Sequence, residues 1–396
     1  MLLKNLSILL GEDLNYIQSI GVKISGARFK RIGSGIRPNT KEESFDCEGL
    51  LLIPGFVNSH THIGDSIAKD ITLNSSVDEK IHPVFGVKAQ VLKNTKPEHL
   101  ASFINNTCKS MIGRGITTFV DFREGGLEGI ALLKNAISSI PIRSVILGRV
   151  DYYQNRLQIR QNEPIPQKRR PELDQLLRKC DGLGLSGANE NSDSTLKFYS
   201  KSNKLRAIHS SETKESVSAS KKYTKKSETI RALQLKPHFL VHMTHASKDD
   251  LHLASKKTRG IVVCPRANAA LAEGIPDVDL MMRTNCNVAI GTDNVMINSP
   301  DMFREMDYLW KVSMGLHKKR INPKDILKMA TVNAGKLLQK DIGVIESQRL
   351  ADCIFIDKHS IDLEPMHSPY ASIVHRASES SIRAVMIGGK IVHGKI

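Results

Sequence analysis

The sequence predicts an α/β protein built around a parallel sheet, with strand-rich segments at both ends. Between about 55 and 345, short apolar runs alternate with stretches whose apolar residues have helical spacing, a pattern typical of parallel sheets. The flanks instead contain short runs of β type, such as 50–53, 353–356 and 384–387. With 396 residues, the chain can hold one large domain and a small one, since an eight-stranded α/β barrel needs about 250 residues.

The alternation can be followed along the chain. The apolar run 50–53 ends at Pro54 and Gly55, which mark a break before the segment that ends in His60 and His62. Beyond it we expect helices over 100–112 and 128–137, and buried strands over 117–120, 144–147, 182–185, 205–208, 239–241 and 288–290.

Two histidines, His60 and His62, stand two residues apart at the end of the first of these segments. In an extended strand, residues i and i+2 point to the same side. Both imidazoles can therefore bind one ion while Thr61 faces away. Alone this spacing is weak evidence for a metal site, because histidines on an exposed strand are usually solvated.

Further polar residues strengthen the interpretation, since each follows a later apolar run: His209 with Glu212 three residues on, His242, and Asp293. Histidines with one carboxylate form a ligand set that Zn²⁺ or Fe²⁺ accepts. All of these residues lie at the carboxyl ends of predicted strands, where barrel enzymes place their active sites.

Seven motifs now stand in order: PGFVNSHTH at 54–62, GITTFVDF at 115–122, HSSE at 209–212, LVHMTHAS at 240–247, CPRAN at 264–268, GTDN at 291–294, and ATVNAGKLL with IGVIESQRLADCIFID within 330–357. Because these motifs occur in the family's order, the chain resembles the amidohydrolase superfamily, and more narrowly its cytosine deaminase and triazine hydrolase branch. The resemblance covers nearly the whole sequence.

The resemblance implies a (β/α)8 TIM barrel over 55–345 and a small β-sandwich domain formed from both termini, 1–54 and 346–396. It also bears on the number of metal ions. Binuclear members of the superfamily commonly end the fourth strand with a carbamylated lysine, whereas here the nearest lysine, Lys179, precedes that strand. A mononuclear site with one divalent ion, Zn²⁺ first and Fe²⁺ second, is therefore expected.

The resemblance also assigns roles. His60, His62, His209 and Asp293 are the expected metal ligands, and the bound ion would lower the pKa of its water toward about 7. Asp293 would accept the water proton. Glu212 would carry a proton to a ring nitrogen and then to the leaving amine, and His242 would orient the hydroxide and stabilise developing charge. Two alternatives stay open: His245 could replace His242, and Glu212 could merely cap the following helix.

Other polar residues after predicted strands are candidates for substrate contacts, the alternative for each being a surface ion pair. They are Arg123 and Glu124 after the second strand, Arg149 and Asp151 after the third, and Arg266 and Asn268 after the seventh. Ala267 stands where the family commonly has a serine, which puts a hydrogen bond there in doubt.

The formal net charge of +16 raises the question of nucleic-acid binding. The basic clusters, at 168–170, 221–226, 256–259 and 318–320, are scattered and contain few aromatic residues. The polynucleotide deaminase signature, His-x-Glu followed by Pro-Cys-x-x-Cys, is absent. A solvated surface is thus favoured over a nucleic-acid interface, and an anionic small molecule remains compatible with the charge.

The cysteines and the apolar runs indicate the cellular compartment in which the protein is expected. The six cysteines are dispersed without a Cys-x-x-Cys pair and read as reduced core residues. Residues 1–10 read as a sandwich strand rather than a signal peptide, and no stretch approaches 18 apolar residues. We expect a cytoplasmic enzyme without a membrane span.

The sequence thus predicts a metal-dependent hydrolase of non-peptide carbon–nitrogen bonds, acting through a metal-bound hydroxide. The favoured reaction is removal of an exocyclic amine from a purine, pyrimidine, pterin-like or triazine ring. One alternative is a cyclic amidase or halide hydrolase, and another is a catalytically silent structural member of the family. Neither the substrate nor the oligomeric state, a homo-oligomer included, can be deduced from the sequence.

Overall fold

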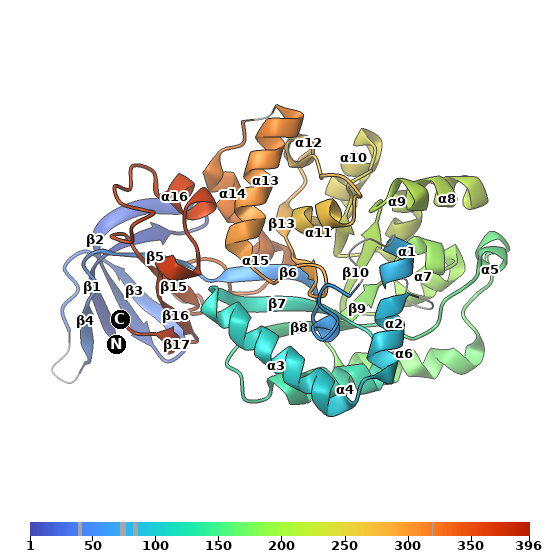
Figure 1. Cartoon of the computed structure of the whole chain (residues 1–396), viewed down its shortest axis with the longest axis horizontal. Coiled ribbons are helices and arrows are strands. Elements are labelled where there is room, and N and C mark those ends of the chain that lie inside the picture. The colour runs from blue at the N-terminus through green and yellow to red at the C-terminus, as the bar shows by residue number, and fades with distance from the viewer. Residues whose placement is uncertain (39–41, 72–76, 82–85, 319) are drawn as a thin grey trace.

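The computed structural model describes residues 1–38, 42–71, 77–81, 86–318 and 320–396. In this part of the chain the strands form two sheets, which lie side by side along the long axis of the molecule (Figure 1). The larger is a curled parallel sheet of nine strands in the order β13-β12-β11-β10-β9-β8-β7-β6-β14. Its strands are β6 (Phe56–His62), β7 (Ile116–Arg123), β8 (Arg143–Gly148), β9 (Gly182–Leu185), β10 (Leu205–Ser210), β11 (Phe239–His242), β12 (Ile261–Val263), β13 (Val288–Ile290) and β14 (Asp293–Asn294).

The two ends of this sheet are consecutive in the sequence. β13 pairs with β12, and β14, which begins after only Gly291 and Thr292, pairs with β6 through Asp293 and Thr61. The sheet therefore curls back toward its first strand, as in TIM-like folds. Gly291 permits the close approach, because a Cβ at this position would lie 2.6 Å from the Cβ of His60.

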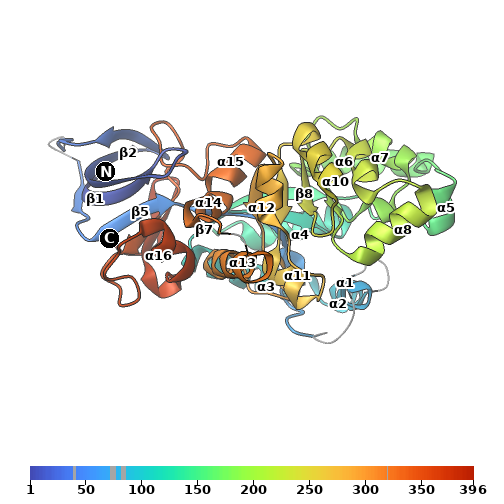
Figure 2. The same ribbon diagram turned by 90° about the horizontal axis from the view of Figure 1, so that it is seen from above.

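Helices flank the curled sheet (Figures 1 and 2). They are α1 (Val77–Ile81), α2 (Val87–Asn94), α3 (Pro97–Gly113), α4 (Gly126–Ile137), α5 (Arg156–Arg160), α6 (Arg170–Lys179), α7 (Asp193–Tyr199), α8 (Lys214–Thr224), α9 (Glu228–Ala232), α10 (Lys248–Lys257), α11 (Pro265–Ala270), α12 (Val278–Arg283), α13 (Met302–His317), α14 (Pro323–Met329) and α15 (Val332–Leu338). Every residue of β6 and β7 is buried, as expected of parallel strands covered on both faces.

The predicted elements of this region are present. The helices expected over 100–112 and 128–137 lie within α3 and α4, and the expected fourth strand coincides with β9. One detail was wrong: β7 continues to Arg123, so this residue ends the second strand instead of following it. The strand is longer because Phe122 and Arg123 still pair with Leu147 and Gly148 of β8.

The smaller sheet combines both termini, which lie close together in Figure 1. Its order is β17-β16-β15-β5-β1-β2-β3, with β4 also paired to β1. The strands are β1 (Leu2–Leu10), β2 (Asn15–Ser25), β3 (Arg28–Gly33), β4 (Ser44–Asp46), β5 (Leu50–Pro54), β15 (Cys353–Asp357), β16 (Ile382–Ile387) and β17 (Lys390–Gly394). The helix α16 (Pro369–His375) lies between β15 and β16 in the chain.

Alternate residues of β5 and β15 belong to two different hydrophobic cores. Ile53 and Ile354, which pair with each other, belong to the large core of the curled sheet and its helices. Leu52 and Phe355, the neighbouring pair, belong to a separate core inside the terminal sheet. Because side chains alternate along a strand, β5 and β15 attach the terminal sheet to the rest of the molecule.

Two further expectations concern the whole chain. All six cysteines are free and buried, as predicted for reduced core residues. Among the described residues, no helix combines the length and the apolar character that crossing a bilayer requires.

Candidate active site

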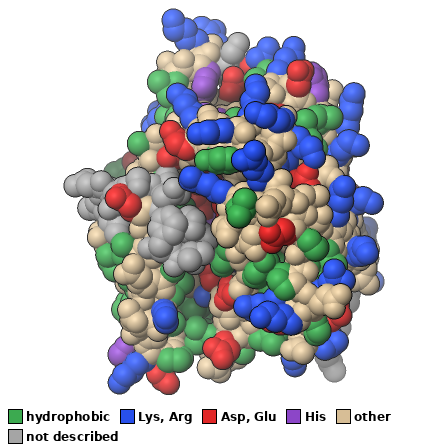
Figure 3. Space-filling view, turned by 90° about the vertical axis from the view of Figure 1, so that its right-hand side faces the viewer, with side chains coloured by type: hydrophobic (Ala, Val, Ile, Leu, Met, Phe, Trp, Pro, Cys, Tyr) green, Lys and Arg blue, Asp and Glu red, His purple; other side chains and the backbone are tan. Residues whose placement is uncertain are grey.

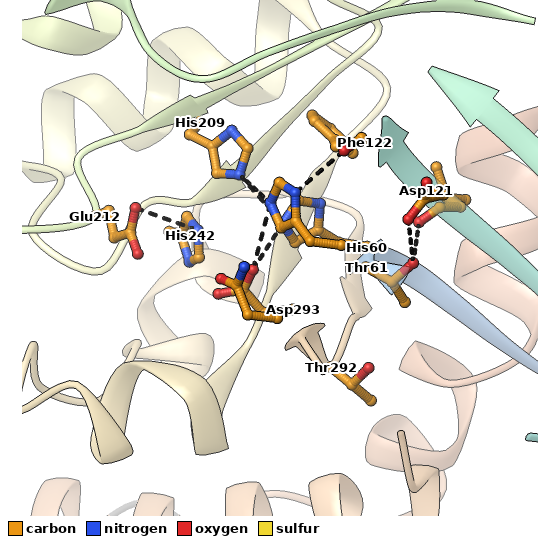
Figure 4. Close-up of polar contacts among 12 residues, drawn as sticks. His60, Thr61, Asp121, Phe122, His209, Glu212, His242, Thr292 and Asp293 are labelled. Carbon is orange, nitrogen blue, oxygen red and sulfur yellow. Dashed lines mark hydrogen bonds and ion pairs between the residues drawn. The ribbon is translucent and has the colours of Figure 1, made fainter. Parts of the chain in front are cut away.

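Four side chains from the ends of β6 and β10 and from β14 converge inside the curled sheet (Figure 4). The Nε2 atom of His209 lies 3.2 Å from Nε2 of His60 and 3.4 Å from Nε2 of His62. Asp293 completes the group, because its Oδ1 atom lies 3.2 Å from Nε2 of His60 and 3.6 Å from Nε2 of His62. All four residues are buried.

The ring orientations show that this group fits a cation. Nδ1 of His209 lies 2.8 Å from the carbonyl oxygen of Leu185, and Nδ1 of His62 lies 3.2 Å from that of Phe122. Carbonyl oxygens only accept hydrogen bonds, so each Nδ1 carries the proton and donates it. The two Nε2 atoms then point lone pairs at each other across 3.4 Å. This repulsion is relieved by a positive ion between them, and imidazole nitrogen with carboxylate oxygen suits a divalent metal.

The protonation states agree with metal binding. Burial lowers the pKa of His60 to about 3 and holds that of His209 well below its usual value. Burial acts to raise the pKa of Asp293, but the hydrogen bond with His60 and the neighbouring histidines outweigh it and hold that pKa well below the usual range. Neutral imidazoles and an ionised carboxylate are the forms that ligate metals.

His242 and Glu212 lie beside this group. Nε2 of His242 is 3.5 Å from Oε2 of Glu212, and its Nδ1 is 3.4 Å from Oδ1 of Asn268. Burial raises the pKa of Glu212, and the nearby carboxylate of Asp293 adds to this, while His242 acts in the opposite direction. His245, the alternative to His242, instead has its Nε2 2.7 Å from the carbonyl oxygen of Glu273.

Left-handed backbone occurs at the functional positions, a feature that the sequence did not reveal. φ is 71° at His242, 60° at Asp293 and 52° at Ser211, which precedes Glu212. For residues other than glycine this conformation is uncommon and costs on the order of 1–3 kcal/mol when the surroundings impose it. The fold therefore holds these side chains in place against a local conformational preference.

A pocket of about 140 Å³ opens beside the group. Its lining includes His62, His209, Glu212, Ser186, Asn189, Glu228 and Asn294. A larger cavity of about 1030 Å³ shares Ile81, Lys88, Glu124 and Arg149 with the pocket. Space for one small ring thus adjoins a broader hollow near α2 and α4.

The expected substrate contacts are distributed unequally around these spaces. Glu124 and Arg149 line the small pocket, whereas Arg123 and Asp151 line only the larger cavity among the spaces described. Asn268 lies against His242. NH1 of Arg266 lies 3.3 Å from Oε1 of the buried Glu305. Contact with substrate stays a prediction for each of them.

Sequence reasoning overlooked Lys88, whose Nζ lies 2.5 Å from Oε1 of Glu124 and 3.4 Å from Oδ2 of Asp65. Lys88 does not directly follow a predicted strand, and it belongs to none of the seven motifs. Asn294, which lines the pocket, could have been found, because it ends the GTDN motif. Glu228, also in the lining, carries no signal in the sequence.

No described residue of the basic clusters lines the small pocket or the larger cavity. On the face shown in Figure 3, Lys and Arg side chains are spread among acidic, apolar and other polar groups. Lys319, part of the cluster at 318–320, lies outside the described residues.

Comparison with known proteins agrees with this geometry. Residues 51–392 match the model of the amidohydrolase family. A putative aminohydrolase of Methanothermobacter thermautotrophicus is 36% identical over 400 residues, covering 99% of each chain. A 5-methylthioadenosine/S-adenosylhomocysteine deaminase of Thermococcus sibiricus is 28% identical, covering 99% of this chain and 93% of its own.

A solved structure shares the fold at much lower identity. The atrazine chlorohydrolase of Arthrobacter aurescens, complexed with zinc, superposes with a TM-score of 0.85 at 15% identity, covering 99% of this chain and 95% of the other. The family match covers the curled sheet and the part of the terminal sheet that follows residue 51, and it includes every residue of the buried histidine and carboxylate group. The chain belongs to the amidohydrolase family and is a metal-dependent hydrolase of carbon–nitrogen bonds.

Proposed function

We propose that this protein removes an exocyclic amine from a nitrogen heterocycle of the purine, pyrimidine, pterin-like or triazine type. The observation that carries the proposal is the place of Glu212: it lines the small pocket and faces His242, with Asp293 on the other side of that histidine. An amine leaves readily only after protonation, so the reaction requires a proton donor at this position. The deaminase names of relatives such as that of Thermococcus sibiricus support the same choice.

The metal is proposed to be a single Zn²⁺ ion held by His60, His62, His209 and Asp293, with Fe²⁺ as the alternative. When bound there, it would supply Lewis-acid activation of a water molecule. The proposal of zinc rests on the donor set and on the zinc complexes known for structural neighbours.

The residues of the chain then have distinct tasks. The carboxylate of Asp293 accepts a proton from the attacking water. Burial raises the pKa of Glu212, which favours its protonated form, and Glu212 gives this proton to a ring nitrogen. The proton that Asp293 took from the water then passes to Glu212 and on to the departing amine, and the hydroxyl left on the ring carbon returns a proton to Glu212 as the carbonyl forms. His242, buried between them, donates a hydrogen bond to the oxygen on which negative charge develops.

Ammonia release tests this proposal. Protein loaded with Zn²⁺ is assayed against aminated purines, pyrimidines, nucleosides, pterins and triazines, with Asp293→Asn as the inactive control. We expect release from one ring class by the wild type alone. Silence across the panel with metal bound would contradict deamination and direct the assay to cyclic amides and halogenated rings.

Two other functions remain as alternatives. Halide hydrolysis is favoured by the likeness to the atrazine chlorohydrolase, and opening of a cyclic amide would use the same water activation. A catalytically silent family member would purify without metal, which the close approach of two unprotonated imidazole nitrogens argues against.

The finer organisation is also a proposal. We place a (β/α)8 barrel at 55–345 by counting β13 and β14 as one interrupted strand, and a β-sandwich domain at 1–54 and 346–396. The separate apolar core between strands of the terminal sheet supports the sandwich. The free, buried cysteines support a cytoplasmic location, and the scattered basic clusters support a small heterocyclic substrate over a nucleic acid.

A further inference from the structure

His62 differs from His209 in what lies behind its ring. Nδ1 of His209 faces a backbone carbonyl, that of Leu185, at 2.8 Å. Nδ1 of His62 faces the carbonyl of Phe122 at 3.2 Å and, more closely, Oε1 of Glu124 at 2.9 Å. A carboxylate that accepts the Nδ1 proton makes Nε2 a stronger metal ligand and fixes the plane of the ring.

Glu124 is itself held by a buried cation. Nζ of Lys88 lies 2.5 Å from the same oxygen, Oε1, and 3.4 Å from Oδ2 of Asp65. Lys88 is only 5% exposed, and a lysine is seldom so buried unless its charge is paired. NH2 of Arg149 stands further off, 3.7 Å from Oε1. A continuous line of contacts therefore runs from α2 through Glu124 to the ring of His62.

We propose that Glu124, held by Lys88, is the positioning residue for His62, orienting its ring and strengthening its Nε2 as a metal ligand. This inference rests on the proposed function in one respect, namely that His62 ligates the metal. It assigns Glu124 a task different from the substrate contact expected from its place after the second strand. Oε1 is committed to His62 and Lys88, so only Oε2 remains to meet a substrate.

The two roles predict different measurements. A positioning residue changes the affinity for the metal in the absence of substrate, whereas a substrate contact changes KM and leaves metal binding alone. The probe is Zn²⁺, whose dissociation constant is measured by competition with a chromogenic chelator. Because this measurement needs no substrate, it is independent of whether the protein proves to be a deaminase.

Matched variants isolate the effect. Glu124→Gln keeps the size of the side chain but removes its charge, and Glu128→Gln makes the same change on an exposed residue of α4. We expect Glu124→Gln to weaken Zn²⁺ binding about 10- to 100-fold, with Glu128→Gln unchanged. The carbonyl of Phe122 still accepts from Nδ1 in the variant, so binding is weakened but not lost.

A second pair of variants tests the contribution of Lys88. Lys88→Gln touches no proposed ligand directly, and Lys93→Gln makes the same change on an exposed residue of the same helix. We expect weaker Zn²⁺ binding in Lys88→Gln and wild-type binding in Lys93→Gln. Wild-type Zn²⁺ affinity in a folded Glu124→Gln protein, with or without a rise in KM, would overturn the proposal. If circular dichroism shows that this variant does not fold, wild-type affinity in Lys88→Gln would overturn it equally.

Discussion

Asn58→Ala is expected to destabilise the protein and to disturb the placement of Asp293. Asn58, on β6, and Thr292, directly before Asp293, form a reciprocal pair. Nδ2 of Asn58 donates to Oγ1 of Thr292 at 2.7 Å, and the backbone N–H of Thr292 donates to Oδ1 of Asn58 at 3.0 Å. Both side chains are fully buried, so water cannot replace either bond.

The magnitude follows from these two bonds. Asn58→Ala leaves the Oγ1 of Thr292 unpaired, and an unsatisfied buried group costs roughly 1–3 kcal/mol. The N–H of Thr292 loses one of two acceptors but still donates to the carbonyl oxygen of His60 at 3.0 Å, so the free energy of unfolding should fall by about 2–4 kcal/mol in all. Thr292→Val keeps the bond from its own N–H to Asn58 and strands only Nδ2, so its cost should be about half as large.

Urea denaturation with a chelator present measures both variants without a contribution from bound metal. Zn²⁺ affinity, measured separately, should also fall in Asn58→Ala, because Asn58 holds Thr292, the residue directly before Asp293. Equal and small losses of stability in the two variants, below about 1 kcal/mol, would refute the reasoning.

Three further predictions concern catalysis, metal removal and pH. Glu212→Gln should lower kcat by about 10²- to 10⁴-fold while Zn²⁺ binding by chelator competition stays unchanged; a variant of wild-type kcat would exclude Glu212 as the proton carrier. Saturation with Zn²⁺ at 100 times its dissociation constant adds about 2.7 kcal/mol, which for a chain of 396 residues should raise Tm by about 3 °C in calorimetry, and Asp293→Asn should show a smaller rise. Burial raises the pKa of Glu305 from 4.5 to about 8, so the folded chain keeps a proton that the unfolded chain releases. The free energy of unfolding should then fall as pH rises from 4.5 to 8, by up to roughly 1.4 kcal/mol per pH unit. Glu305→Gln should flatten this part of a chemical-denaturation pH profile, and an unchanged slope would show that the buried carboxyl stays ionised.

Local pattern was sufficient to predict that these four side chains come together. His60, His62, His209 and Asp293 each end or follow a short apolar run, and in a parallel sheet the carboxyl ends of neighbouring strands meet at one edge. Their convergence in the structure therefore follows from strand order alone. The pairing of β5 with β15 likewise brings two β-type runs from opposite ends of the chain together.

Other features depend on tertiary packing and have no local signature. Lys88 lies on a helix whose spacing does not distinguish it from Lys93, yet the fold buries only the former. The left-handed backbone of His242 and Asp293 is uncommon for any residue other than glycine, and no neighbouring residue in the sequence indicates it. Glu124 was noticed for its place after a strand, but its contact with His62 depends on how far β7 extends beside β6.

Metal titration of ammonia release tests the central claim most directly. Metal-free protein is given increasing equivalents of Zn²⁺, and the rate of ammonium formation from the best aminated ring is followed beside Asp293→Asn. The account predicts no release without metal, a rise that levels off at one ion per chain, and none from the variant at any ratio. Release by the metal-free protein, or a rate that keeps rising to two ions per chain, would contradict a single metal site formed by these histidines and Asp293.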